Sequence, residues 1–124
     1  METQQNPGLP FMKMHGLGND FVVLDARASG RMPEPGLVAA MADRHRGVGF
    51  DQMAVILPGE NADARLVFYN ADGSVSGACG NATRCVARFL MDQGGKSALR
   101  LATDHAVLSA EDLSLIHISE PTRQ

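Results

Sequence analysis

The chain is most constrained by residues 70–88, where a turn leads directly into an amphipathic helix. The turn is indicated by Asn-Ala-Asp-Gly, whose residues adopt turn conformations readily, after an apolar run. We expect a helix over about residues 81–93, capped at its start by Asn81 and ended by Gly94 and Gly95. Its buried face is indicated by apolar side chains at helical spacing: Ala82, Cys85, Val86, Phe89 and Leu90.

This helix would place Cys79 immediately before its first turn. Unpaired backbone N–H groups and the positive end of the helix dipole lie at that point, and both favour the thiolate form of a cysteine. The same N–H groups, from Gly80 onward, can hold a carboxylate. A nucleophilic or basic sulfur beside an anion site predicts a reaction centre.

Size, charge and cysteine usage set limits on the class of protein. The 124 residues suffice for one domain with a modest core, or for part of something larger. A net charge of -3 gives no reason to expect nucleic acid or a membrane surface as a partner, and the basic residues are scattered apart from Arg44-His45-Arg46. No transmembrane run or signal peptide is recognised, so we expect a cytoplasmic protein with reduced cysteines.

The rest of the chain predicts an α+β fold. Residues 1–10 are expected to be a disordered leader, and a short amphipathic helix is expected from Leu37 to about Arg46. Six segments have the apolar or alternating pattern of strands: residues 11–14, 21–24, 53–57, 64–69, 98–103 and 106–109. Because their spacing is hairpin-like, we expect a curved, mostly antiparallel sheet wrapped around the central helix.

Amide side chains stand at the ends of these elements. Asn19, Gln52 and Asn70 each lie at a junction between a strand and a loop. Asn81 lies at the start of the helix beside Cys79. Any one of these amides is typical of turn chemistry. Together they suit an amino-acid zwitterion, because amides offer both donors and acceptors to an ammonium and a carboxylate.

Four motifs, in this order, resemble those of one family. They are Gly18-Asn19-Asp20-Phe21, Gly49-Phe50-Asp51-Gln52, Tyr69-Asn70-Ala71-Asp72-Gly73 and Ala78-Cys79-Gly80-Asn81-Ala82-Thr83-Arg84-Cys85. Together they resemble the N-terminal half of the diaminopimelate epimerases. We therefore expect residues 11–112 to form an N-terminal epimerase lobe, with the C-terminal lobe absent from this chain.

The resemblance implies an isomerase of the lysine and peptidoglycan precursor pathway that converts LL- to meso-diaminopimelate without pyridoxal phosphate, metal or other cofactor. A thiolate removes the α-proton on one face of the substrate, and a thiol on the other face returns one. The resemblance makes Cys79 the first catalytic thiol and implies a homodimer for the full-length form. It implies substrate contacts from Asn19, Gln52, Asn70, Gly80 and Asn81.

Two departures from the family pattern lead to further expectations. The second lobe would carry the other thiol, so we expect this chain to be inactive alone. Cys85 cannot replace that thiol, because it lies on the same helix as Cys79 and is expected to pack as a small core residue. Residues 113–124 resemble translated adapter read-through, and we expect them to be extraneous and to contribute nothing to the fold. A divergent strand is the alternative.

Other functions compete with the epimerase hypothesis. A proline-racemase-type isomerase uses the same two-thiol chemistry, but a histidine is usual there at the position of Asn81. A non-catalytic lobe that binds an amino acid is a second alternative. A redox or metal site is the weakest candidate, because the two cysteines form no C-x-x-C motif and the four histidines lack ligand spacing.

Overall fold

The computed structural model describes residues 11–16, 18–45, 47–77, 80–104, 107–112 and 116–119, so the expected leader lies outside the described residues. The elements are β1 (Phe11–Gly16), β2 (Asn19–Asp25), α1 (Pro35–Ala42), β3 (Gln52–Pro58), β4 (Ala64–Asn70), β5 (Val75–Ser76), α2 (Gly80–Gly94), β6 (Ala98–Ala102), β7 (Val107–Asp112) and β8 (Ile116–Ser119). Neither helix among these residues is long and apolar enough to cross a membrane.

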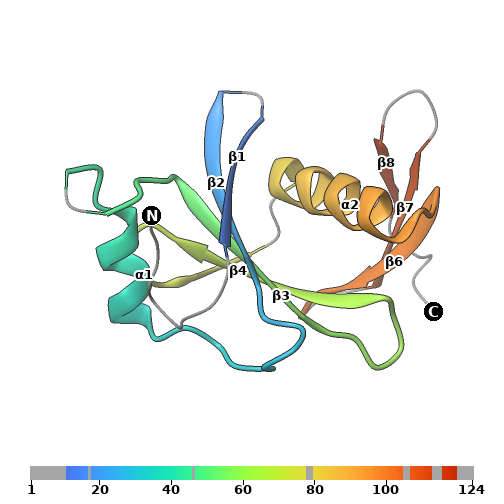
Figure 1. The fold of residues 1–124 in the computed structure, drawn as a ribbon, viewed down its shortest axis with the longest axis horizontal. Coiled ribbons are helices and arrows are strands. Elements are labelled where there is room, and N and C mark those ends of the chain that lie inside the picture. The colour runs from blue at the N-terminus through green and yellow to red at the C-terminus, as the bar shows by residue number, and fades with distance from the viewer. Residues whose placement is uncertain are drawn as a thin grey trace.

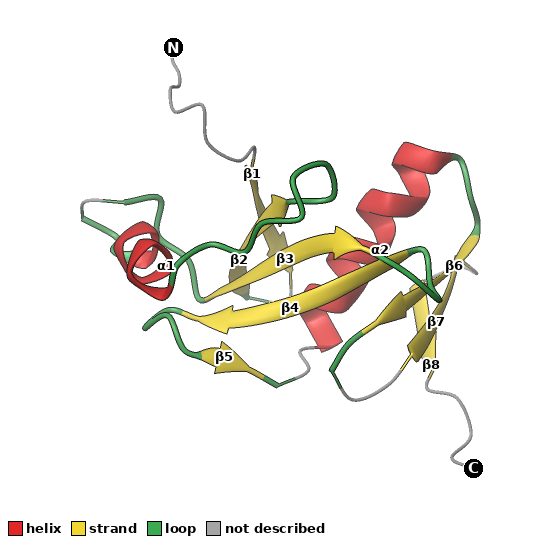
Figure 2. Cartoon of the chain, turned by 90° about the horizontal axis from the view of Figure 1, so that it is seen from below, coloured by secondary structure: helices red, strands yellow, loops and turns green. Residues whose placement is uncertain are grey.

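The strands form one mixed sheet. Its order is β1-β2-β3-β4-β6-β7-β8, and the short β5 pairs with the end of β4 at Phe68 and Tyr69 and runs back toward α2 (Figure 2). All pairings in the described residues are antiparallel except β2 with β3 and β4 with β6. The predicted α+β fold with a mostly antiparallel sheet is confirmed. The hairpin-like spacing did not reveal the two parallel pairs, which are joined by crossovers through α1 and α2.

The sheet curves around α2, as predicted. Figure 1 shows this helix between the β1–β2 hairpin and the strands β6–β8, above β3 and β4, and it contacts β1, β3, β6, β7 and β8. Because side chains alternate along a strand, each face of the sheet has its own core. In β2, Phe21 and Val23 belong to the core on the α2 face, whereas Val22 and Leu24 belong to the core that packs on α1.

Helix α2 uses the predicted apolar face with small differences at its ends. Its buried side chains are Ala82, Thr83, Val86, Ala87, Leu90 and Met91. Cys85 and Phe89 are half-buried and pack against the same core, which confirms the expected packing role of Cys85. The predicted cap is wrong, because α2 already includes Gly80 and so Asn81 lies within its first turn. Periodicity could not mark this start, since glycine has no side chain to add to the pattern.

The end of α2 follows the prediction. Gly95 has a φ of 68°, in the left-handed region that glycine adopts without strain. The Lys96 backbone N–H then donates to the Met91 carbonyl oxygen at 3.0 Å. This six-residue closure is the Schellman arrangement, which satisfies a carbonyl at the end of a helix and turns the chain toward β6.

Helix α1 is shorter than predicted, because it ends at Ala42 and not near Arg46. Asp43 already has extended backbone angles, and the chain then turns back on the helix. The Gly47 N–H donates to the Asp43 carbonyl oxygen at 2.8 Å, and the Gly49 N–H donates to the Met41 carbonyl oxygen at 2.8 Å. The loop therefore satisfies the Met41 carbonyl in the last turn of α1, and the residues after Ala42 lie outside the helix.

The segment after Asp112 adds a strand to the sheet. Strand β8 pairs with β7 in antiparallel register from Asp112↔Ile116 to Ser109↔Ser119, and it contacts α2. The expectation that residues 113–124 contribute nothing to the fold is therefore wrong for Ile116–Ser119. The divergent strand, given above as the alternative, describes these four residues. The extraneous origin of the segment stays a prediction.

Gly73 yields a prediction about stability. Its φ is 89°, and a side-chain carbon at this position would lie far too close to the carbonyl oxygen of Pro35 at the start of α1. We expect Gly73→Ala to lower the free energy of unfolding by about 2 kcal/mol, because it combines backbone strain with a steric clash. Urea unfolding measures this difference. Gly77→Ala is the matched control, since nothing lies within 4 Å of its added carbon and its φ is ordinary. Equal stability of the two variants would contradict the prediction.

Candidate active site

Three of the predicted binding residues lie at one end of the sheet. Asn19 begins β2, Gln52 begins β3, and Asn70 ends β4. Because β2 and β3 are parallel while β4 runs the opposite way, these three positions share an end. Gln52 and Asn70 are direct partners in the β3–β4 register. The pairing of the strands therefore assembles the amides from distant parts of the sequence.

The three amides also share a face of the sheet. Residues two apart on a strand point to the same side. Each amide stands two positions from a residue of the core beneath α2: Asn19 from Phe21, Gln52 from Ala54 and Asn70 from Phe68. All three side chains are half-buried, so each is partly accessible to a ligand and partly shielded from water. They occupy the α2 face of the sheet at the margin of its core.

Hydrogen bonds link two of these amides to the segment that leads into α2. The Gln52 Nε2 donates to the Ser76 Oγ at 3.2 Å, and the Asn70 Nδ2 donates to the Ser74 Oγ at 3.1 Å. Ser76 ends β5 and precedes the first residue of α2 by four positions. Since an extended residue spans at most about 3.6 Å, α2 begins within about 14 Å of Ser76. The segment that leads into α2 is thus joined to two of the amides, and α2 begins four residues after Ser76.

The segment between Asn70 and β5 is itself a hydrogen-bonded turn. The Gly73 N–H donates to the Asn70 carbonyl oxygen at 3.0 Å, and the Asn70 N–H donates to the Ser74 carbonyl oxygen at 2.8 Å. The Asp72 carboxylate accepts from the Ser74 hydroxyl at 2.6 Å, and this hydrogen bond lowers the pKa of Asp72. The turn predicted from Asn-Ala-Asp-Gly is confirmed. Its hydrogen bonds hold the backbone of Asn70 at the point where the chain turns from β4 toward β5.

The predicted catalytic residue, Cys79, lies outside the described residues, and so does the preceding Ala78. Gly80 is the first residue of α2, and Asn81 is the second. The roles of these three residues and their distances from the amides therefore stay predictions. What the structure establishes is that the chain passes from the sheet margin at Ser76 and Gly77 into the N-terminus of α2.

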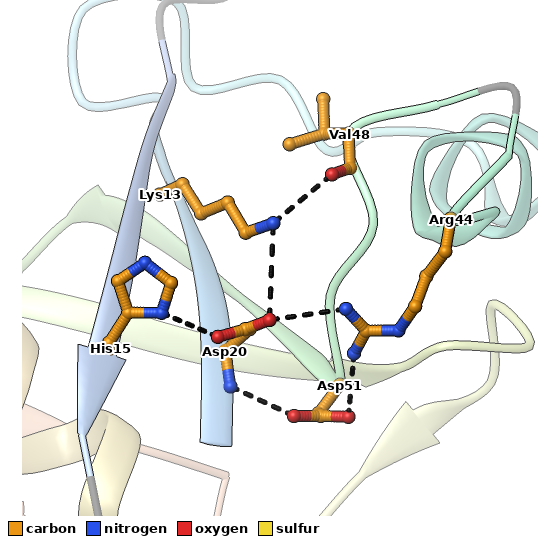
Figure 3. Close-up of polar contacts among 6 residues, drawn as sticks. All are labelled: Lys13, His15, Asp20, Arg44, Val48 and Asp51. Carbon is orange, nitrogen blue, oxygen red and sulfur yellow. Dashed lines mark hydrogen bonds and ion pairs between the residues drawn. The ribbon is translucent and has the colours of Figure 1, made fainter. Parts of the chain in front are cut away.

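A network of charged residues that the sequence did not predict joins Arg44 to Asp20 and Asp51 (Figure 3). These two carboxylates are the neighbours of Asn19 and Gln52 in the chain. The Arg44 guanidinium donates from Nη1 to the Asp20 Oδ2 at 3.1 Å and from Nη2 to the Asp51 Oδ1 at 3.0 Å. From β1, the His15 Nδ1 lies 2.5 Å from the Asp20 Oδ1, and the Lys13 Nζ lies 3.9 Å from the Asp20 Oδ2. Its sequence signals were the short basic cluster that includes Arg44 and the two motifs that contain Asp20 and Asp51.

This network perturbs the ionisation of its members. The hydrogen bond from Arg44 is the main cause that holds the pKa of Asp20 below its ordinary value of 3.8, and the hydrogen bond with His15 adds to it. The same contact with Asp20 raises the pKa of Arg44. Among the described residues, no group of three or more His, Cys, Asp or Glu side chains is placed to hold a metal ion.

Comparison of the fold with solved structures identifies the class of protein. A phenazine biosynthesis protein of the PhzF family from Bacillus anthracis superposes with a TM-score of 0.59 at 21% identity, over 83% of this chain and 34% of that one. A PhzF-family protein from Enterococcus faecalis gives 0.57 at 15% identity, over 77% and 35%. At these identities the likeness concerns the fold alone. The chain is an α+β lobe of the kind found in these larger proteins.

Sequence comparison then identifies the family. The profile of the Diaminopimelate epimerase family matches residues 11–113, and the chain belongs to this family. The diaminopimelate epimerase of Acidiphilium cryptum is 55% identical over 82% of this chain and 37% of its own length. That of Phenylobacterium zucineum is 50% identical over 77% of this chain and 35% of its own length. The chain thus spans about a third of the length of these relatives.

The low pKa of Asp20 predicts how stability depends on pH. A carboxyl whose pKa is lower in the folded state stabilises it above the unfolded pKa, and this contribution is lost as the pH falls through the folded pKa. We therefore expect Asp20→Asn to destabilise the chain at pH 6, and the difference from the wild type to shrink below about pH 3.8. Urea unfolding at pH 6, 4 and 3 measures it. A difference that stays constant over this range would contradict the assignment.

Proposed function

We propose that this chain is the Cys79-bearing lobe of a diaminopimelate epimerase, which inverts one α-carbon of LL-diaminopimelate to give meso-diaminopimelate. One observation supports this proposal in a chain of this family. The three amides lie at the same end of the sheet, and the segment that leads into α2 is hydrogen-bonded to that end. Amide groups and helix N–H groups are the partners that an amino-acid zwitterion requires.

The proposed roles follow from the chemistry of these groups. Gly80 and Asn81 provide backbone N–H groups at the start of α2, which bind the substrate carboxylate and stabilise the charge that develops on it. The amides of Asn19, Gln52 and Asn70 bind the remaining polar groups of the substrate. The positive end of the helix lowers the pKa of the Cys79 thiol, so that its thiolate removes the α-proton near neutral pH.

Inversion also needs a proton donor on the opposite face of the α-carbon. Cys85 does not suit this role, because it packs against the core beneath α2, on the same helix that Cys79 precedes. We propose that the second thiol belongs to the part of the full-length protein that this chain does not contain. The full-length enzyme is proposed to be a cytoplasmic homodimer that needs no cofactor. The isolated lobe would then bind substrate weakly and would not epimerise it.

The first prediction from this proposal concerns thiol reactivity. With limiting iodoacetamide at pH 7, we expect Cys79 to be alkylated at least tenfold faster than Cys85, because Cys85 is half-buried against the core. Peptide mass mapping measures both rates. In urea the two cysteines should react at similar rates, which provides the control. Preferential alkylation of Cys85 in the folded chain would contradict the proposed role of Cys79.

The second prediction concerns catalysis. We expect the purified chain to give no epimerisation of LL- or meso-diaminopimelate in D2O. A chimera that joins residues 11–112 to the remainder of the Acidiphilium cryptum enzyme should exchange the α-proton and interconvert the two isomers. Mass spectrometry and NMR measure deuterium at the α-carbon. Cys79→Ala should abolish exchange in the chimera, and Cys85→Ala is the matched control that should retain it. A folded chimera without exchange, or one indifferent to Cys79→Ala, would contradict the proposal.

A further inference from the structure

The charged network lies on the face of the sheet opposite to the candidate site. Asp20 alternates with Asn19 along β2, so the two side chains point to opposite sides. Asp20 shares its side with Val22 and Leu24, which belong to the core packed on α1. His15 is the direct β1 partner of Asp20 and adds its ring on this side. None of these charged side chains therefore lies on the amide face of the sheet.

The network nevertheless holds the backbone on which two of the amides stand. Asp20 directly follows Asn19, and Asp51 directly precedes Gln52. The Asp20 N–H donates to the Asp51 Oδ2 at 2.8 Å, and the Asp51 N–H donates to the Asp20 carbonyl oxygen at 3.0 Å. The two strand starts are thus joined just before the regular β2–β3 register begins at Phe21↔Gln52.

The Arg44 guanidinium closes this junction by bridging both carboxylates. Without it, the carboxylates of Asp20 and Asp51 would face each other where the two strands begin, and their like charges would repel. Among the described residues, Lys13 and His15 would remain beside Asp20. The planar fork of arginine can donate to two acceptors at once in a fixed geometry, which a lysine ammonium does not reproduce.

The loop around Arg44 is built to hold its side chain in this place. Gly49 has a φ of 79°, and a side-chain carbon there would lie 3.1 Å from the Arg44 Cγ. The Gly49 N–H is fixed by the Met41 carbonyl oxygen at 2.8 Å. The Lys13 Nζ donates to the Val48 carbonyl oxygen at 3.2 Å and ties the same loop to β1. Because α1 ends at Ala42, Arg44 lies in the loop and not on the helix, and its side chain reaches Asp20 and Asp51 where β2 and β3 begin.

We propose that Arg44 is a positioning residue for the site: by bridging Asp20 and Asp51 from the α1 face, it sets the places of Asn19 and Gln52 on the α2 face. The inference rests on the proposed function in taking these two amides as substrate contacts. About half of the Arg44 and Asp51 side chains is exposed, at 52% and 45%. Exposed ion pairs contribute little to global stability, so we expect the loss of Arg44 to act mainly on the local backbone, whereas the loss of Asp20 also removes the contacts with Lys13 and His15.

The experiment compares Arg44→Gln and Arg44→Lys with Arg65→Gln in the full 124-residue chain. Arg65 is the matched control, because it is an arginine of similar exposure that pairs with a single carboxylate, Asp104. Backbone hydrogen exchange is followed by NMR. In both Arg44 variants we expect exchange at the Asp20 and Asp51 N–H groups to quicken at least tenfold, with no change at Val55 in the middle of β3.

The outcomes of this exchange experiment either support or overturn the inference. Faster exchange confined to Asp20 and Asp51, absent from Arg65→Gln, supports it. Unchanged exchange at these two groups overturns it. Exchange that quickens equally at Val55 also overturns it, because it shows a general loss of stability. If Arg44→Gln does not fold, Arg44→Lys decides, since it keeps the charge and loses only the fork.

A second measurement separates positioning from the proposed function. Diaminopimelate is titrated into each chain while the side-chain amide signals of Asn19, Gln52 and Asn70 are followed. We expect the dissociation constant to rise at least fivefold in Arg44→Gln and to stay unchanged in Arg65→Gln. Equal affinity of wild type and Arg44→Gln overturns the positioning role. If the wild-type chain shows no diaminopimelate-dependent shift, the proposed binding function fails, and hydrogen exchange alone decides whether Arg44 positions the two strand starts.

Discussion

The contact between α2 and one face of the curved sheet is the interaction on which the rest of the structure depends. Every side chain of the larger core either belongs to α2 or lies on a strand beneath it. A fully buried aliphatic or aromatic side chain contributes about 1.5–3 kcal/mol, so this contact supplies much of what opposes chain entropy. It also sets the place of α2 on the sheet, because Val86 and Met91 are buried in the core between the helix and the strands.

The alternation of side chains along β2 and β3 separates two tasks that neighbouring residues perform. Asn19 and Gln52 point to the face where a substrate is proposed to bind, while Asp20 and Asp51 bind Arg44 behind them. Neighbouring residues in the chain thus place their side chains on opposite faces of the sheet, so a contact on one face can hold a side chain on the other. This division allows a charged network to stand close to the site without offering its carboxylates to an amino-acid substrate, whose own carboxylate they would repel.

The sequence allowed the elements and the family to be predicted better than their arrangement. The buried face of α2, the glycine stop and the turn at Asn70 follow from local patterns, and the structure confirms them. The parallel pairs depend on contacts between distant segments, which periodicity does not encode. The early end of α1 depends on backbone hydrogen bonds with the loop that follows it, and β8 depends on pairing with the neighbouring β7, neither of which a side-chain pattern marks. Distance along the chain also hides the Arg44 network: Arg44 lies 24 positions after Asp20 and 7 before Asp51, and nothing in a basic cluster indicates which carboxylates it contacts.

The parallel pairing of β2 with β3 has a consequence for how the site is made. Two segments that run the same way cannot meet through a tight turn, so the intervening chain must cross over before they align. Residues 19 and 52 therefore come together only after a long loop has closed, at an entropic cost that local contacts do not offset in advance. A fragment that ends before β3 contains Asn19 but lacks Gln52, so it cannot bring the two amides together. The closeness of these two amides is thus a property of the completed sheet and of no single segment.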